Sequence, residues 1–160
     1  MDFKEAVQQN RFRSPQVEAA LNIIFTANQL QEISRDQLKP YNLSGEQYNV
    51  LRILRGKHPE AYSLNEIRDR MLNRWSNASR LVDKLKKKKY VTRQLLESNR
   101  RKVEIRITEK GMNLLDELEN LPIAGNLYDR GLSKQKAKQL TNLLDEFRSN
   151  LEKHLHQKNK

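Results

Sequence analysis

The feature that most constrains the fold is a change in the spacing of apolar residues between positions 78 and 107. The first apolar residues of this stretch recur at three- and four-residue spacing, as on one face of a helix; they are Ala78, Leu81, Val82 and Leu85. The last ones alternate with charged residues, as in a half-buried strand; they are Val103, Ile105 and Ile107. With a partner strand at 90–96 and a hairpin tip at 97–101, this pattern predicts a helix followed by a β-hairpin.

Start and stop signals predict three helices before this unit. Ser14-Pro15 opens a long helix, because serine caps the first turn and proline fits the first helical position, and Pro40 ends it. Capping-box patterns at Ser44–Gln47 and Ser63–Glu66 open two shorter helices. Gly56 is the expected end of the first of these.

Two more helices are expected after the hairpin. Thr108–Gly111 opens one that Pro122 ends, and Ser133 caps the last. The segment 123–132 between them contains two glycines and no periodicity, so it is predicted to be a linker. The chain is therefore expected to be mainly α-helical with one small β-hairpin.

The positive charge of the chain is concentrated in the same central region. Residues 68–110 hold 15 Lys and Arg against 5 Asp and Glu, whereas the remaining residues hold 16 against 15. A localised positive surface carried by helices and a hairpin is typical of a DNA-binding module.

Composition excludes several other classes of function. The absence of cysteine removes disulfides and thiolate chemistry. The start of the chain lacks the apolar stretch of a secretion signal, and no apolar run approaches the length of a membrane span, so we expect a cytoplasmic protein. GxSxG, HExxH and P-loop patterns are missing, so we expect neither an enzyme nor a cofactor. His58, His154 and His156 are too scattered to predict a metal site.

The two long helices near the ends of the chain predict a dimer. The N-terminal one is expected to be roughly 37 Å long, and its broad apolar band includes Leu21. The C-terminal one carries a heptad-like apolar seam; its residues are Ala137, Leu140, Leu144, Phe147 and Leu151. We expect Leu21 and this seam to pack against a second copy of the chain.

Residues 63–89 are expected to form a helix-turn-helix, in which the second helix can enter the major groove of DNA. Polar side chains near the start of that helix would reach bases or phosphates; they are Arg74, Ser76, Asn77, Ser79 and Arg80. Lys84, Lys87 and Lys88 are expected to contact phosphates. A plain helical hairpin with a solvated polar face is the alternative, and the adjoining basic hairpin argues against it. Trp75, beside the turn, is expected to pack in the core.

Three segments carry a resemblance to a known family: RWSNASRLVDKL at 74–85, NRRKVEIRIT at 99–108 and the EKG that follows. Together they resemble the MarR family of winged-helix transcription regulators, and the resemblance is strongest from Ser44 to Leu118. It implies a homodimer whose first and last helices intertwine. It also implies a recognition helix that begins at Ser76–Arg80 and a basic wing.

The wing residues that this resemblance assigns to DNA are Arg100, Arg101 and Lys102, with Arg101 as the arginine that enters the minor groove. Two positions depart from the family pattern. Asn99 stands where the family usually has an aspartate that can brace the neighbouring arginine by a charge-assisted bond. Lys89 stands where the family often has glycine, and a left-handed residue there costs about 1 kcal/mol without glycine.

We therefore interpret the chain as a homodimeric winged helix-turn-helix protein that binds a near-palindromic operator in double-stranded DNA. The resemblance implies repression relieved by a small-molecule effector. That effector would lie where the dimerising helices meet the DNA-binding lobe, near Phe25, Asn28, Tyr48 and Leu51, which are equally consistent with core packing.

The winged helix-turn-helix lobe is expected at 43–107, and the helical dimerisation region at 1–42 and 108–160. Two other functions stay open on the sequence. One is a non-specific architectural DNA-binding protein held by phosphates alone. The other is a protein–protein adaptor that uses the winged helix as a docking surface.

Overall fold

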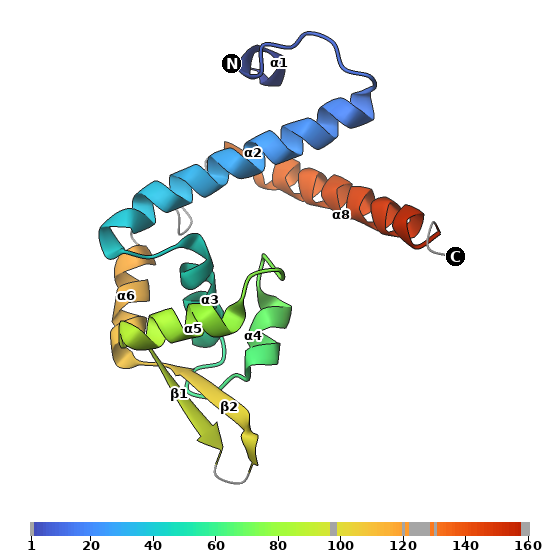
Figure 1. Ribbon diagram of the computed structural model, residues 1–160. Helices are drawn as coiled ribbons and strands as arrows, with labels where there is room; N and C mark the ends of the chain where they lie inside the picture. Colours follow the sequence, from blue (N-terminus) through green and yellow to red (C-terminus); the bar gives the residue numbers. More distant parts are fainter. Residues whose placement is uncertain (1, 97–98, 120, 122–128, 130, 158–160) are drawn as a thin grey trace. The chain divides into compact units, whose positions relative to one another are not determined.

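The computed structural model describes residues 2–96, 99–119, 121, 129 and 131–157, with the backbone alone at 96, 99–102, 156 and 157 (Figure 1). The elements in chain order are α1 (Phe3–Ala6), α2 (Pro15–Leu38), the 3-10 helix η1 (Lys39–Tyr41), α3 (Gly45–Arg55), α4 (Leu64–Arg70), α5 (Ala78–Lys87), β1 (Val91–Leu96), β2 (Asn99–Ile107), α6 (Glu109–Glu119) and α8 (Lys134–Gln157). A mainly helical chain with a two-stranded antiparallel hairpin confirms the predicted fold class. The chain divides into two compact units, Met1–Glu117 and Leu118–Lys160.

Helix α3 lies at the centre of the first unit, in contact with α2, α4, α5 and β2 (Figure 1). The side chains that form the core around it come from all of these elements; they are Leu38, Val50, Leu51, Leu54, Ile67, Val82, Leu85 and Ile105, each at most 1% exposed. Burial of each such side chain contributes about 1.5–3 kcal/mol. The predicted apolar face of α5 is thereby confirmed, and the polar face of this helix is left outside the core.

Side-chain caps begin the helices at the predicted positions. The hydroxyl of Ser14 accepts the N–H of Val17 at the start of α2. Ser44 with Gln47 and Ser63 with Glu66 form complete capping boxes at α3 and α4. In the second box the backbone N–H of Ser63 donates to the Glu66 carboxylate at 2.8 Å, which lowers the pKa of Glu66.

Helix α1 was not predicted. Asp2 and Glu5 form a capping box around its four residues, and this signal stands in the sequence at the spacing that a cap requires. Phe3 holds the segment in place, because its ring stacks on Phe12 at 5.5 Å between centroids and meets Phe25 edge-on at 5.8 Å. Phe25, a candidate for the effector site or for core packing, is half-buried and contacts this segment.

The hairpin has the predicted partners and a longer second strand. Strands β1 and β2 pair antiparallel, with Val91 opposite Ile107. The prediction of a tip at 97–101 is wrong for its second half, since β2 begins at Asn99 and pairs there with Leu96. Backbone pairing needs no alternation of apolar residues, so the basic run gave no sign of it; positions 97 and 98 lie outside the described residues.

Tyr62 adds a third chain segment to the hairpin. Its N–H donates to the carbonyl of Ile105 at 2.9 Å, and the N–H of Ile105 donates back at 2.8 Å. A single bridging residue leaves no periodic signal in the sequence, so this contact was not predicted. It joins the base of the hairpin to the segment between α3 and α4.

Helix α5 ends in a left-handed residue that is not glycine. Lys89 has φ 63°. Its N–H donates to the carbonyl of Lys86 at 2.9 Å, and the N–H of Tyr90 donates to that of Leu85 at 3.1 Å, which is the pattern of a Schellman cap. The turn therefore has the conformation that glycine favours, with a lysine in its place.

The start of α6 is locked onto this turn. The hydroxyl of Thr108 donates to the carbonyl of Lys89 at 2.8 Å and accepts the N–H of Gly111 at 3.1 Å. A Cβ atom on Gly111 would lie 2.4 Å from the carbonyl oxygen of Tyr90 and 2.8 Å from the side chain of Ile107. Only glycine allows this approach, and the two contacts explain the threonine and the glycine of the sequence after the hairpin.

The second unit contains helix α8, which Ser133 caps by accepting the N–H of Lys136 at 3.3 Å. Residues of its predicted seam are incompletely covered in the chain: Leu140 is 46% and Leu151 47% exposed. Most of the predicted linker at 123–132 lies outside the described residues. Among the helices that the structure describes, none has both the length and the apolar character needed to cross a membrane.

The strained turn gives a stability prediction. Lys89→Gly removes the Cβ that disfavours the left-handed conformation, so the free energy of unfolding should rise by about 1 kcal/mol. Lys86→Gly, at an exposed position inside α5, is the matched control and should lower it by about the same amount. Denaturant unfolding of both variants measures the difference, and equal destabilisation by the two would contradict the left-handed cap.

Candidate nucleic-acid interface

The turn between α4 and α5 is braced by polar side chains of α3. Asn49 accepts the N–H of Leu72 at 3.1 Å. One carboxylate oxygen of Glu46 accepts both the side-chain amide of Asn73, at 3.3 Å, and the hydroxyl of Ser76. Because α3 is the centre of the core, these bonds hold the turn and the start of α5 in a fixed position.

The braced turn presents apolar side chains to solvent. Trp75 is 98% exposed and Leu72 is 92% exposed. The prediction that Trp75 packs in the core is wrong, because the turn directs its polar groups to α3 and the core beneath is filled by other residues. Arg74, which lies between them in the sequence, is exposed. An exposed tryptophan beside basic residues is a feature of an interaction surface.

Helix α5 is buried on one face and polar on the other. Asn77 is its N-cap, and the side-chain oxygen of Asn77 accepts the N–H of Arg80 at 3.0 Å. An open groove runs along the polar face; its lining residues are Asn77, Ser79, Arg80, Asp83, Lys84 and Lys87. The helix therefore places most of the predicted recognition residues together on one surface.

Arg93 on strand β1 forms an ion pair with Asp83, the acidic residue of that groove. Its guanidinium pairs with the carboxylate of Asp83 and donates to the hydroxyl of Ser79 at 3.3 Å. The ion pair offsets the negative charge of Asp83, which otherwise opposes a negatively charged partner. Sequence reasoning missed Arg93, Glu46 and Asn49, because nothing local in the chain indicates contacts across 10 to 30 residues.

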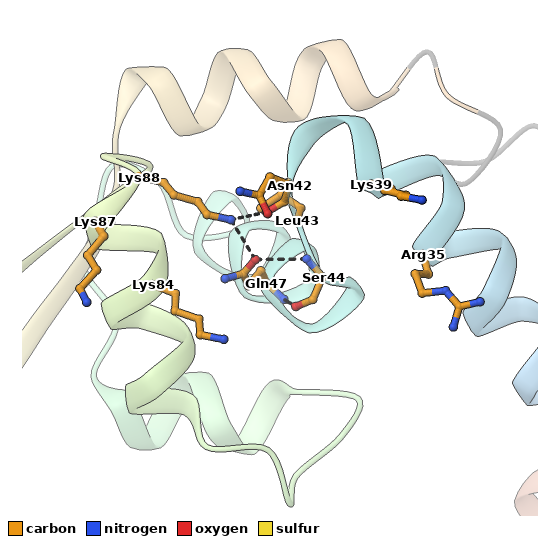
Figure 2. Close-up of a pocket in the computed structure, with 9 residues that line it drawn as sticks. All are labelled: Arg35, Lys39, Asn42, Leu43, Ser44, Gln47, Lys84, Lys87 and Lys88. Atoms are coloured by element: carbon orange, nitrogen blue, oxygen red, sulfur yellow. Dashed lines mark hydrogen bonds between the residues drawn. The ribbon is translucent and has the colours of Figure 1, made fainter.

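Lys88, the C-cap residue of α5, differs from the lysines within the helix. Its ammonium group donates to the backbone carbonyl of Asn42 and to the side-chain oxygen of Gln47, the latter at 3.4 Å (Figure 2). Lys88 thus faces the start of α3, whereas Lys84 and Lys87 line the groove on the polar face. Partial burial, and after it the charge of Lys84, lower the pKa of Lys88.

The remaining predicted site residues lie in several places. Arg100, Arg101 and Lys102 belong to β2, and their side chains are outside the described residues. Of the proposed effector contacts, Leu51 is fully buried, Phe25 and Tyr48 are half-buried and Asn28 is exposed. The hydroxyl of Tyr48 accepts a bond from Arg52 at 3.0 Å. Leu21 of α2 is 41% exposed.

Helices α3, α4 and α5 followed by the hairpin define a winged helix-turn-helix protein. The sequence model of the MarR family matches residues 41–102. A solved MarR transcription factor from Planctomyces limnophilus is 33% identical, with a TM-score of 0.64; the match covers 86% of this chain and 98% of that one. The chain belongs to the MarR family of transcription regulators.

Two more distant solved structures share the fold. MepR of S. aureus, in a complex with DNA, is 18% identical over 82% of this chain and 96% of its own, with a TM-score of 0.72. BpsR of Bordetella bronchiseptica, whose DNA binding is regulated by 6-hydroxynicotinic acid, is 22% identical over 86% and 96%, with a TM-score of 0.69. No curated protein matched the sequence.

The helix cap at Asn77 and its predicted contact with DNA can be separated by mutation. Asn77→Asp keeps the cap, so stability should be unchanged, but its added charge should weaken DNA binding at least about tenfold, which is the lower end for a lost base contact. Asn77→Ala should lower the free energy of unfolding by about 1 kcal/mol, because the cap is lost. Denaturant unfolding and anisotropy of a labelled duplex measure both effects. Unchanged DNA affinity for Asn77→Asp would remove Asn77 from the interface.

Proposed function

We propose that this MarR-family protein is a homodimeric, sequence-specific DNA-binding regulator that represses transcription until a small molecule releases it. The observation that carries this proposal is the polar groove of α5. Its cations and hydrogen-bonding groups are collected on one face of a helix, and contacts to α3 and β1 fix both the helix and the turn before it. We expect the protein to act in the cytoplasm, as a non-enzymatic factor.

The proposed docking places α5 in the major groove. Asn77 and Arg80 lie in its first turn, where side chains of a recognition helix meet base edges. Lys84 and Lys87 lie further along the same face and would contact phosphates, which supply affinity without sequence preference. Arg101 in the wing would enter the minor groove, where the potential is most negative when the groove is narrow.

Two solved relatives support the partners in this proposal. MepR was solved with DNA, and the DNA binding of BpsR responds to 6-hydroxynicotinic acid. For this chain we propose a small-molecule effector. Its proposed position, near Phe25, Asn28 and Tyr48, follows from the sequence. In the described residues α2 and α3 meet further along α2, where a side chain at Gly45 would touch Ser34, and Phe25 packs on Phe3 instead. Fully buried Leu51 could join such a site only after side chains rearrange.

Exposed apolar residues on both long helices support a dimer. Helix α2 exposes several large apolar side chains; they are Val17, Leu21, Ile23, Ile24 and Leu30, each between 37% and 57% exposed. Helix α8 exposes Leu140, Leu143 and Leu151. Each such side chain gains stability when a partner covers it, so a second copy of the chain is the occupant that we propose.

Introducing negative charges into the apolar seam of α8 tests the proposed dimer. Leu144→Asp combined with Phe147→Asp should give monomeric or unfolded protein, because carboxylates cannot be buried without partners. Asn142→Asp with Asn150→Asp adds the same charge at exposed positions of α8 and should leave the dimer intact. Light scattering gives the mass of each variant, and a stable dimer of the seam variant would refute the role of α8.

The operator should be two-fold symmetric, with half-sites about 10 bp apart from centre to centre, because each subunit of a two-fold dimer offers one recognition helix. Nuclease footprinting on genomic fragments tests this. Discrete symmetric protection separates a regulator from an architectural protein, which would protect DNA uniformly. A wild-type dimer that fails to bind any duplex would leave the adaptor function as the better proposal.

A further inference from the structure

We propose that an open pocket beside α5 binds a phosphate group. The pocket has a volume of about 590 Å³ and lies where the end of α2, the turn after η1 and the start of α3 approach α5 (Figure 2). The proposal builds on the DNA-binding function, because the pocket shares part of its wall with the groove that would meet DNA. It adds basic residues from α2 and η1 that lie outside the helix-turn-helix.

The pocket is lined by cations on opposite sides. Arg35 of α2 and Lys39 of η1 form one side, and the other side is formed by α5 and its C-cap residue, with Lys84, Lys87 and Lys88 (Figure 2). The nine residues that line the pocket in the described structure include neither Asp nor Glu. In Figure 2 the ammonium groups of Lys84 and Lys88 point into this space, whereas the charged ends of Arg35 and Lys39 point away from α5. A lining with basic side chains and no carboxylate favours a ligand with several negative charges or several acceptor oxygens, as a phosphate group has.

The back wall of the pocket is polar and ordered. Gln47 is 4% exposed, and its side-chain oxygen accepts the N–H of Ser44 at 3.1 Å as well as the ammonium of Lys88. Ser44 caps α3, so the positive end of the dipole of this 11-residue helix faces the same space. This wall holds Lys88 where its charge is partly desolvated and close to the charge of Lys84. A bound anion would offset the repulsion between these two positive charges.

Neighbouring acidic groups compete only weakly for these cations. Arg35 lies 3.7 Å from Glu32 and 3.9 Å from Asp36, and all three side chains are largely exposed. Exposed pairs of this kind contribute little. Glu46, the acidic residue in the first turn of α3, is bonded to Asn73 and Ser76 on the α4–α5 turn. An incoming phosphate group therefore meets a positive field.

Lys84 and Lys87 line both the pocket and the groove of α5. The phosphate group has two possible sources, and they have opposite consequences for regulation. A phosphodiester of the bound DNA would extend the protein–DNA contact beyond α5. A free phosphorylated molecule would withdraw the two shared lysines from DNA and weaken its binding.

The test uses the full-length protein and a paired set of variants. Arg35→Gln with Lys39→Gln removes two pocket cations and leaves α5 unchanged. Lys136→Gln with Lys138→Gln removes the same charge from exposed positions of α8 and is the control. DNA affinity is measured at several salt concentrations, and pyrophosphate is titrated by calorimetry without DNA and as a competitor of DNA at constant ionic strength.

If the source is DNA, the pocket variant should show a smaller salt dependence: the magnitude of the slope of log affinity against log salt should fall by about 0.9 per DNA-bound subunit. The slope of the control should remain unchanged. If the source is a free phosphate, pyrophosphate should bind to wild type and control and weaken their binding to DNA. The pocket variant should bind pyrophosphate at least tenfold more weakly. Equal salt slopes and equal pyrophosphate binding in all three proteins would overturn the proposal. Failure of wild type to bind DNA would instead refute the proposed function, while calorimetry would still test the pocket.

Discussion

The close approach of Gly111 to the carbonyl oxygen of Tyr90 is the constraint on which the position of the recognition helix depends. It brings the start of α6 against the end of α5, where Thr108 completes the contact by bonding the carbonyl of Lys89. The other end of α5 is fixed by Glu46, through the turn that precedes the helix. With both ends held and one face buried, the helix retains a single free face, and that face is polar and basic.

This arrangement explains why a surface of flexible side chains can act as a binding site. The backbone of the turn and of α5 is ordered before any partner arrives, so association need not order it. Arg93 of β1 offsets the negative charge of Asp83 by an ion pair, although Arg93 itself does not line the groove. The hairpin is thus both a wing and a support for the helix that it follows.

Local signals predicted most of the fold and part of the site. Caps such as Ser44 with Gln47 lie within four residues, and the apolar residues of α5 recur at helical spacing within one helix. Both features can therefore be predicted from the sequence. The exposure of Trp75, the bridge of Tyr62 and the ion pair of Arg93 depend on distant segments, and no spacing encodes them. Lys89 is an intermediate case. The sequence indicated that a turn there lacks its usual glycine, and the structure shows a left-handed Lys89 in a Schellman cap.

The central claim is that α5 and the turn before it form the DNA-reading surface. Trp75 tests it most directly, because it is the only tryptophan of the chain and stands fully exposed on that turn. Addition of a specific duplex should change the fluorescence of Trp75 with the same midpoint as anisotropy of the labelled DNA. Tight DNA binding with no change in the emission of Trp75 would contradict this placement of the interface.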